Sequence, residues 1–276
     1  MKLEVMVLHV LVCTLDDGIT RVPHLLKPER EDIRYVISFQ YSDEKFLSLI
    51  PDALRRKDVQ IVTLPGRGLC RNRNHAMSFV NDGIALIADD DLFYFEDTFD
   101  TILETFRSHT EIDLAFFKTK TPDGEPEYKK YPLVEKSYTR WKGYAPSSIE
   151  VAFRVETVKR KGIWFDERFG LGSARLSGGE ELMFVDACLK QGLQARFFPK
   201  YIVLHPCMSN GDSSAFTLRA AMTMGALCHH FKGWLAFPAM VKFTWQAFRK
   251  GEKRPVSPFK YYIWLVKGIL YERATR

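Results

Sequence analysis

Four nearly continuous apolar segments near the start of the chain constrain its fold more strongly than any other feature. They cover residues 4–15, 33–41, 59–64 and 84–89. Segments with helical spacing of apolar residues follow them, at residues 43–56, 71–80 and 95–109. Apolar strands that alternate with helices are typical of a mainly parallel sheet that is covered on both faces. The sequence therefore predicts an α/β fold, with a mostly parallel central sheet flanked by helices.

The remainder of the chain continues this alternation and then changes character. The expected elements are a strand, a helix and two short strands, at 113–121, 180–192, 194–199 and 201–206. The intervening stretch 122–146 is rich in Gly, Pro, Tyr and Lys, which predicts a loop or a small hairpin. Gly192 stands where a helix prefers a glycine at its C-terminal end. We expect an α/β domain at residues 1–210 and a helical C-terminal extension at 211–276.

The composition is that of an ordinary globular protein, with 46% apolar and 27% charged residues. No segment reaches the roughly 18 apolar residues of a transmembrane helix. The apolar start resembles a signal peptide only superficially, because Glu4 and His9 interrupt it. The cysteines form no Cys-x-x-Cys pair, so reduced thiols in a cytoplasmic protein are expected rather than a zinc site or a disulfide framework. They are Cys13, Cys70, Cys188, Cys207 and Cys228.

Three consecutive aspartates, Asp89, Asp90 and Asp91, follow the fourth apolar segment, with no Lys or Arg beside them in the sequence. In an open α/β sheet, ligands bind at the carboxyl ends of the strands. Clustered carboxylates repel one another unless a cation joins them, and Mg²⁺ or Mn²⁺ also binds phosphate oxygens. The triplet therefore predicts a divalent cation site, the alternative being a solvated acidic turn.

The segment "GRGLCRNRNHAM" offers groups that complement such a site. Gly66 and Gly68 allow a tight turn. Arg71 and Arg73 stand at the start of the next helix, where guanidinium groups and backbone N–H groups suit phosphate oxygens. The alternative is a basic solvated turn with Asn74 as a local cap. Together with the acidic triplet, the segment favours a metal–diphosphate ligand.

These motifs carry a resemblance to a known family. "GLCRNRNHAM…IALIADDDLFY" resembles the Gly-Leu-Ser-x-x-Arg-Asn…Asp-x-Asp passage of family 2 glycosyltransferases with the GT-A fold. The later "FDERFGLG…SGGEELMFVDACLKQGLQARFFP" is similar to the acceptor-side passage of that family. The resemblance covers roughly residues 4–206, with the motifs in order. It implies a GT-A-like, Rossmann-like sheet that binds a nucleotide-sugar donor.

The resemblance also implies roles for the three aspartates. Asp89 and Asp91 match the outer residues of Asp-x-Asp. Asp91 would bind the Mn²⁺ or Mg²⁺ that holds the diphosphate, and Asp89 would lie nearer the nucleoside or sugar, within reach of the metal. Asp90 is the middle residue and is expected to be the least constrained.

Four further residues match the nucleotide side of the family. Arg73 and Asn74 match the pair that braces the nucleotide. Thr14 stands where the family's Pro-Thr-Tyr/Phe-Asn motif meets the nucleotide, although this chain reads "VCTLDDG" there. Asp43 is a looser match to the acidic residue that follows the second strand.

Two adjacent glutamates are candidates for the base that deprotonates the acceptor. "SGGE" fits a capping box in which Ser177 is the N-cap and Glu180 reaches back to it. Glu181 would then be free and aligns with the family's second acidic residue, the general base. A helix N-terminus favours the ionised carboxylate that a base requires. Glu181 is the preferred base, and Glu180 stays the alternative.

A histidine follows the last expected strand. His205 is a candidate to complete the metal shell, as a histidine does in some GT-A enzymes. The alternative is a half-buried histidine that caps the strand.

The C-terminal extension is strongly basic. From Cys228 onward it holds ten Lys and Arg residues against Glu252 and Glu272, interleaved with aromatic residues. This pattern favours binding at a membrane surface. Nucleic-acid binding is the competing interpretation but is not expected here, and helices that pack on the first domain are the third.

The sequence thus predicts an inverting, metal-dependent hexosyltransferase. It would move a sugar from a nucleotide-diphosphate donor to a saccharide or lipid-linked glycan, in the synthesis of a cell-surface polysaccharide. The expected location is the cytoplasm, peripherally at the inner face of the membrane. The alternatives are a catalytically degenerate GT-A domain that serves as a binding or scaffold subunit, and a sugar nucleotidyltransferase. A sugar nucleotidyltransferase is expected to have a lysine in the loop after the first strand, and the segment "TLDDGITRVPH" contains none.

Overall fold

The computed structural model describes residues 5–139, 145–206, 216–249 and 254–275. The chain divides into two compact units. The sheet unit comprises Met1–Asp166 and Glu181–Cys207, and the helical unit comprises Glu167–Glu180 and Met208–Arg276. Residues 167–180, which the sequence places in the first domain, therefore belong with the C-terminal helices.

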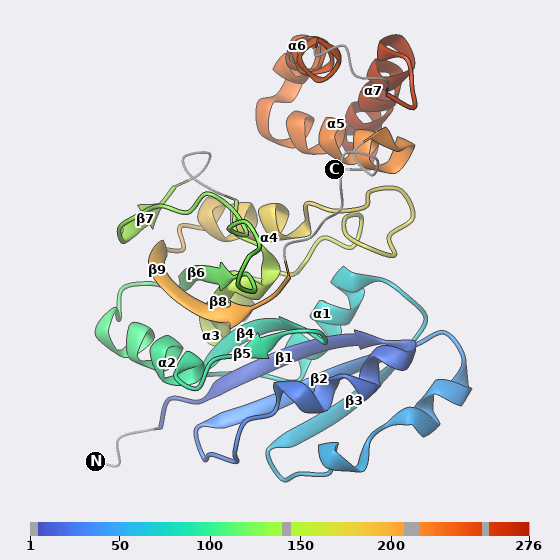
Figure 1. Ribbon diagram of the computed structural model, residues 1–276. Coiled ribbons are helices and arrows are strands. Elements are labelled where there is room, and N and C mark those ends of the chain that lie inside the picture. Colours follow the sequence, from blue (N-terminus) through green and yellow to red (C-terminus); the bar gives the residue numbers. More distant parts are fainter. Residues whose placement is uncertain (1–4, 140–144, 207–215, 250–253, 276) are drawn as a thin grey trace. The chain divides into compact units, whose positions relative to one another are not determined.

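The first half of the sheet unit is a parallel sheet (Figure 1). Its strands run in the order β3-β2-β1-β4, and each neighbouring pair is parallel. They are β1 (Leu8–Leu15), β2 (Ile33–Tyr41), β3 (Val59–Pro65) and β4 (Ile84–Asp89). The four apolar segments of the sequence therefore form strands as predicted.

The second half of the sheet is mixed. β8 lies between β4 and β6 and is antiparallel to both, whereas β6 and β9 are parallel. Short β5 and β7 each pair with β9 in the antiparallel sense. These strands are β5 (Phe93–Tyr94), β6 (Leu114–Lys120), β7 (Lys136–Tyr138), β8 (Val151–Arg154) and β9 (Ala195–Leu204). The mostly parallel arrangement thus holds for the first half, and the whole is a mixed α/β sheet.

Proline decides two details that the sequence pattern predicts wrongly. The two strands expected at 194–206 are one strand, because the β6–β9 register shifts beside Pro199 and accommodates its missing N–H group. The helix expected at 43–56 is two short 3-10 helices, Glu44–Leu49 and Asp52–Leu54. Pro51 disfavours a helical conformation at Ile50 and so separates them.

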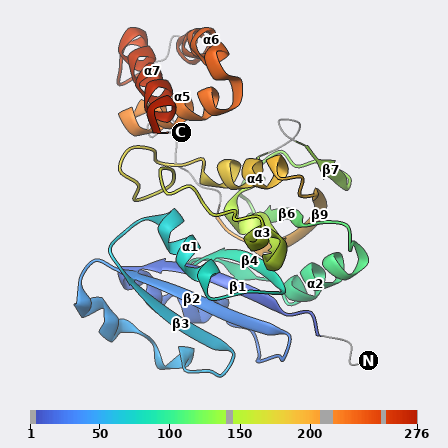
Figure 2. The same cartoon turned by 180° about the vertical axis from the view of Figure 1, so that it is seen from behind.

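Helices cover both faces of the sheet, as Figure 2 also shows from behind. One hydrophobic cluster joins the sheet to α2, and a second joins it to α1, α3 and α4. The helices are α1 (Leu69–Ser78), α2 (Thr98–Ser108), α3 (Val155–Arg160) and α4 (Glu180–Lys190). Gly192 ends α4 with a φ of 81°, and Leu193 N–H donates to Cys188 O at 3.1 Å. This is the predicted glycine C-cap.

Among its described residues, the helical unit contains α5 (Leu218–Lys232), the 3-10 helix η7 (Gly233–Leu235), α6 (Ala236–Phe248) and α7 (Pro258–Thr275). A side chain on Gly225 would collide with Leu265 O, and one on Gly268 would collide with Met222 O. These two glycines therefore allow the backbones of α5 and α7 to approach closely. Within the part of the chain that the structure describes, no helix is long and apolar enough to span a bilayer.

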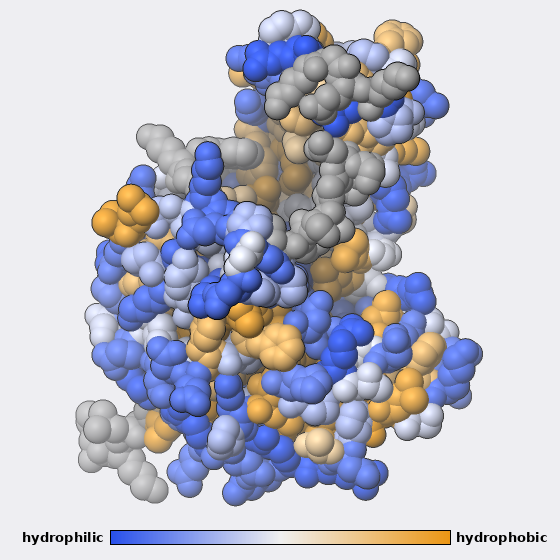
Figure 3. Space-filling model, in the orientation of Figure 1, coloured by the Kyte–Doolittle hydropathy of each residue, from blue (hydrophilic) through white to orange (hydrophobic). Residues whose placement is uncertain are grey.

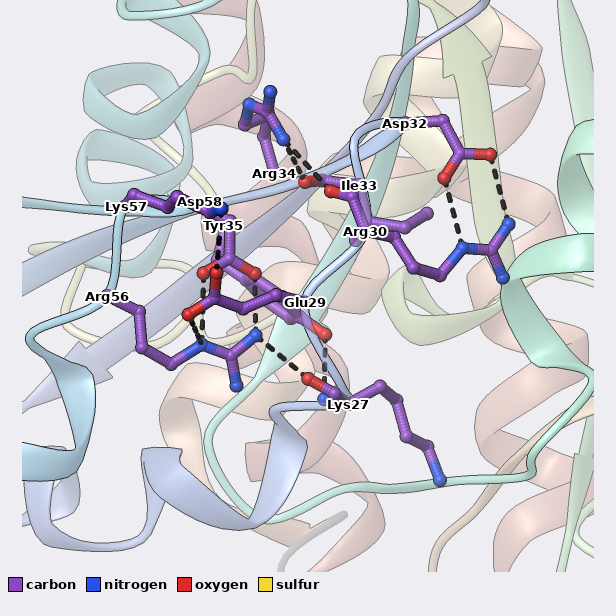
Figure 4. Close-up of polar contacts among 10 residues, drawn as sticks. All are labelled: Lys27, Glu29, Arg30, Asp32, Ile33, Arg34, Tyr35, Arg56, Lys57 and Asp58. Atoms are coloured by element: carbon purple, nitrogen blue, oxygen red, sulfur yellow. Dashed lines mark hydrogen bonds and ion pairs between the residues drawn. The ribbon is translucent and has the colours of Figure 1, made fainter.

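A polar network fastens the amino-terminal ends of β2 and β3 (Figure 4). Arg56 Nε and Nη2 donate to the two oxygens of Asp58 at 2.9 and 2.6 Å. Arg56 Nη2 also donates to Lys27 O at 2.8 Å, and Lys27 N–H donates to Tyr35 Oη at 3.0 Å. The Asp58 side chain is only 2% exposed. This ion pair is therefore shielded from solvent on the side of the carboxylate.

We predict that Asp58→Asn destabilises the protein by about 2–3 kcal/mol, because it leaves the partly buried Arg56 guanidinium with only the more distant Glu29 carboxylate, at 3.8 Å, as a counter-charge. Chemical denaturation measures the loss. Asp52→Asn is the matched control, since the Asp52–Arg55 pair is 89% and 79% exposed. It should change stability by no more than about 0.5 kcal/mol. Equal effects of the two variants would contradict the prediction.

Candidate functional site

The acidic triplet emerges from the sheet at the carboxyl end of β4, directly after the buried Ala88. Asp90, the middle residue, has three side-chain donors. Thr14 Oγ1 donates to Asp90 Oδ2 at 2.5 Å, and Arg21 Nε and Nη2 donate to Oδ1 at 3.2 and 2.7 Å. The prediction that Asp90 is the least constrained aspartate is therefore wrong, because neighbouring loops hold its carboxylate in place.

Arg21 is a site residue that the sequence analysis missed. It follows β1, 69 positions before Asp90 in the chain, and its side chain is 51% exposed. The Asp90 hydrogen bonds raise the pKa of Arg21, so it remains a cation. The triplet, which has no basic neighbour in the sequence, thus has one in space.

Arg73 supplies the second positive charge. Its side chain is 1% exposed, and Nη2 donates to Ser148 Oγ at 2.7 Å and to Asp89 Oδ1 at 3.5 Å. Burial raises the pKa of Asp89, the charge of Arg73 opposes that shift, and the charges of Asp91 and Glu181 add to it. The charge of the buried Arg73 guanidinium and the charges of neighbouring carboxylates therefore both act on Asp89, in opposite directions.

Asp91, shortly after β4, and His205, directly after β9, lie together although they are far apart in the chain. Their Oδ1 and Nε2 atoms are 3.7 Å apart. The polar contact between these two side chains lowers the pKa of Asp91 and raises the pKa of His205. His205 Nδ1 lies 2.7 Å from Pro206 O, which can only accept, so Nδ1 carries a proton. Nε2 is therefore the nitrogen that faces Asp91.

The two candidate bases differ in their surroundings. α4 begins at Glu180, Gly179 before it has a φ of 84°, and Ser177 N–H donates to Thr223 Oγ1 at 2.8 Å. The predicted capping box is therefore wrong, because the helix begins too late for Ser177 to cap it. Glu180 is 4% exposed, whereas Glu181 is partly exposed.

The charge of Glu181 acts on two residues of the site. The charge of Glu181 raises the pKa of both Asp89, the last residue of β4, and Tyr128, in the loop after β6. Glu181 thus acts on the side of the sheet where the acidic triplet emerges. This placement agrees with the preferred choice of Glu181 as a candidate base.

Tyr128 is a second site residue that the sequence analysis missed. It comes from the stretch 122–146, and its ring meets the ring of His205 edge-on at 5.9 Å. Burial raises the pKa of Tyr128, and the charges of Asp89 and Glu181 are among the smaller causes. It therefore borders both the His205 side and the Glu181 side of the site.

Glu150 anchors the loop that carries Tyr128. This carboxylate is fully buried (0% exposed) and accepts from Lys129 Nζ at 3.1 Å, Thr119 Oγ1 at 3.1 Å and Ser147 N–H at 2.8 Å. Tyr131 Oη donates to it as well. Lys129 and Tyr131 follow the loop residue Tyr128 by one and three positions, so Glu150 fixes the chain directly after it.

The remaining predicted residues are placed as follows. Thr14 is buried, and besides its bond to Asp90 its carbonyl accepts from Asn72 Nδ2 at 3.1 Å. Asn74 exchanges two hydrogen bonds with the backbone of Phe165, at 2.9 and 2.8 Å, and so fastens a loop. Asp43 is exposed and caps a 3-10 helix through Lys45 N–H at 3.0 Å. Arg71 is exposed. Of these, only Thr14 meets the acidic triplet.

The turns predicted at the two glycines before α1 are present, since Gly66 and Gly68 have φ angles of 97° and 136°. A further acidic residue, Asp16, lies nearby. Asp16 accepts from Ser42 N–H at 2.7 Å and from Arg67 Nη2 at 3.0 Å, and it has a φ of 54°. It connects the ends of β1 and β2 and the turn before α1.

Gly18 lies against the acidic triplet. A side chain here would collide with Asp90 Oδ2 and Thr14 Oγ1. We therefore predict that Gly18→Ala displaces the Asp90 carboxylate and lowers catalytic turnover by about 100-fold, as a misplacement of about 1 Å can. A turnover assay and a crystal structure of the variant check this. Wild-type activity with an unmoved Asp90 would contradict it.

Comparison with known proteins shows the family and the fold of the chain. The model of the family described as "Glycosyl transferase family 2" matches residues 15–157. Among curated proteins, none matches the sequence. The fold is similar to that of residues 1–349 of TarS from S. aureus, with 14% identity and a TM-score of 0.59 over 98% of this chain and 72% of that chain.

Two further TarS structures are similar to this chain. The complex of TarS 1–349 with UDP-GlcNAc gives 15% identity and a TM-score of 0.59, over 98% of this chain and 73% of that one. The complex with UDP gives 16% identity and a TM-score of 0.55, over 98% of this chain and 91% of that one. The similarity confirms the expected GT-A-like fold, with its curled sheet flanked by helices and followed by a helical region.

Proposed function

Because the chain belongs to glycosyl transferase family 2, we propose that it transfers a sugar from a nucleotide-diphosphate donor to a hydroxyl group of a saccharide or lipid-linked glycan. One observation carries this proposal. Strands, helices and loops from both halves of the sheet unit bring five side chains to the acidic triplet at the end of β4, namely Thr14, Arg21, Arg73, His205 and Glu181. Cationic and anionic groups thus meet at the edge of the sheet where an α/β fold binds its ligands.

The cations would stabilise the departing nucleoside diphosphate. Arg73 is buried and held by Ser148, so its orientation is fixed before the donor binds. Arg21 is half exposed and can reach a ligand while it remains near Asp90. Fixed positive charges at a site of developing negative charge stabilise the transition state without reorganisation.

The side chains at the site provide some of the ligands that a hard divalent cation needs. In the residues with described positions, no group of three or more His, Cys, Asp or Glu side chains could hold a metal ion. Asp91 and His205 supply one carboxylate oxygen and the Nε2 nitrogen, with Asp89 nearby. Mg²⁺ is commonly bound by only one or two carboxylates, with phosphate and water completing its shell. We propose that Asp91 and His205 hold Mn²⁺ or Mg²⁺, which would neutralise diphosphate charge when bound.

Glu181 is the proposed general base. As the acceptor oxygen forms its bond to C1 of the sugar, Glu181 takes the proton of that hydroxyl group. The bond from C1 to the diphosphate oxygen breaks with its electron pair on the leaving group. Attack opposite to the leaving group inverts the anomeric centre in one displacement.

The acceptor proposed is a saccharide of a cell-surface polysaccharide or its lipid-linked precursor, processed at the cytoplasmic face of a membrane. A glycosyltransferase assay tests the proposal. Purified protein is incubated with UDP-GlcNAc and other nucleotide sugars, and release of the nucleoside diphosphate is followed with and without Mn²⁺. UDP-GlcNAc is the first donor to try, because a TarS structure contains it. Donor turnover with the wild type but not with Asp91→Asn is the expected outcome.

A further inference from the structure

The C-terminal helices, over their described residues 216–249 and 254–275, are one-sided in charge. Residues 216–249 and 254–275 contain a single acidic residue, Glu272. Glu272 is fully buried (0% exposed) beside His229 and His230. The same ranges contain eight basic residues, namely Arg219, Lys232, Lys242, Arg249, Arg254, Lys260, Lys267 and Arg273. No acidic side chain of these two ranges therefore balances the basic ones at the surface.

Large apolar side chains lie among these cations. Trp234, Leu235, Val241 and Trp245 are 64%, 69%, 54% and 62% exposed. On the helical spacing of α6, Val241 and Trp245 share one side with Lys242 and Arg249, whereas Ala236, Met240 and Thr244 on the other side are buried. We name the exposed set the α6 face, and its members are Trp234, Leu235, Val241, Lys242, Trp245 and Arg249.

The tryptophans of the α6 face lie against guanidinium groups. Arg249 Cζ is 5.6 Å from the ring centroid of Trp245, and Arg273 Cζ is 4.7 Å from that of Trp234. Trp234 also stacks on Phe237 at 5.8 Å. Such cation–π pairs hold an aromatic ring and a cation at the same level. That is the arrangement required at a lipid headgroup layer, where indole rings and phosphates lie at similar depth.

α7 repeats the pattern. Phe259, Ile263 and Leu270 share one side of this helix and are 75%, 38% and 49% exposed. Lys260 and Lys267 border that stripe and are exposed. Figure 3 shows hydrophobic and hydrophilic residues side by side on the surface of the C-terminal helices. Two helices therefore present apolar residues edged with cations.

We propose that the α6 face binds the surface of an anionic lipid bilayer, lying in the headgroup layer without crossing it. The charge complementarity selects this occupant, because basic residues surround the apolar ones and bind acidic headgroups. A second copy of the chain would place the same cations against one another in a symmetric interface. This inference rests on the proposed function in one respect: a lipid-linked saccharide acceptor would require the protein to reach a membrane surface.

Vesicle co-sedimentation of the full chain, without donor or metal, tests the proposal. The probes are vesicles of phosphatidylcholine with 30% phosphatidylglycerol, and vesicles of phosphatidylcholine alone. We expect binding to the anionic vesicles and much weaker binding to the neutral ones. Each basic residue near the surface contributes about fivefold, so Lys242→Gln with Arg249→Gln should weaken binding about 25-fold. Trp234→Ser with Trp245→Ser should weaken it about tenfold or more.

Matched controls lie on the sheet unit. Trp164 is 41% exposed and lies 6.0 Å from Lys159 Nζ, so Trp164→Ser removes a similar cation–π pair elsewhere. Lys136→Gln with Lys161→Gln removes two exposed charges. Both controls should bind vesicles like the wild type. Raising the salt to about 0.5 M should release the wild type, a test that needs no variant.

Several results would overturn the inference. They are no binding to anionic vesicles, equal binding to both vesicle types, or wild-type binding by the α6-face variants. A dimer in sedimentation velocity that the Trp234 and Trp245 substitutions dissociate would assign the face to a second copy. Tighter binding to single-stranded RNA than to vesicles would assign it to nucleic acid. A protein that turns over its donor but ignores vesicles would refute this inference alone and leave the proposed function standing.

Discussion

Glu181→Gln should lower the turnover of sugar transfer by about 10²–10⁴-fold while the donor still binds. Glutamine keeps the shape of the side chain but cannot accept the proton of the acceptor hydroxyl group. The residue is partly exposed, and its charge is felt by Asp89 and Tyr128, so the substitution acts on the site rather than on the core. Turnover and the donor dissociation constant, measured separately, check the result.

Glu180→Gln is the matched control for Glu181. The two glutamates are neighbours at the start of α4, but Glu180 is only 4% exposed. We expect Glu180→Gln to affect stability more than turnover. If Glu180→Gln abolished transfer while Glu181→Gln left it intact, the assignment of the base would be reversed.

Asp91→Asn should lower donor turnover by about 100-fold or more and weaken the metal dependence of donor binding, because it replaces the carboxylate that faces His205. The Asp91 side chain is 54% exposed, so the folded protein should tolerate an amide of the same shape. Release of the nucleoside diphosphate is followed across a titration of Mn²⁺.

Asp123→Asn controls for the loss of one carboxylate. Asp123 is 98% exposed and pairs only loosely with Lys120, at 3.7 Å. Its substitution should leave both turnover and the Mn²⁺ dependence unchanged. An Asp91→Asn protein with wild-type turnover and an unaltered response to Mn²⁺ would show that Asp91 holds no metal.

The part of the fold that could be predicted is the part that local pattern encodes. β1 to β4 are continuous apolar segments, and buried parallel strands leave that signature directly in the sequence. The insertion of β8 between β4 and β6 leaves no such trace, since strand pairing depends on contacts between residues far apart in the chain. The association of residues 167–180 with the C-terminal helices is hidden for the same reason.

The residues of the candidate site also differ in whether a local sequence pattern could locate them. Asp89, Asp91, His205 and Glu181 stand at the ends of recognisable elements, where a sequence pattern can locate them. Arg21 could not be found in this way, because it comes from a turn 69 residues away from its partner Asp90. Tyr128 comes from a stretch without periodicity, and the buried Glu150 holds Lys129 and Tyr131, which follow it in the chain. Loops deliver these groups, and loop conformation is set by tertiary contacts.

The proposal that the carboxyl end of β4 binds a nucleotide-diphosphate sugar is tested most directly by a thermal-shift screen of the wild type. UDP-, GDP-, dTDP- and CMP-sugars are each added with Mn²⁺ or with EDTA. At about one hundred times its dissociation constant, a true donor should stabilise the protein by about 2.7 kcal/mol, or roughly 5 °C or more in melting temperature. We predict that one nucleotide class gives this shift with Mn²⁺ and loses most of it with EDTA. Folded protein that no nucleotide sugar stabilises, with or without Mn²⁺, would contradict the account.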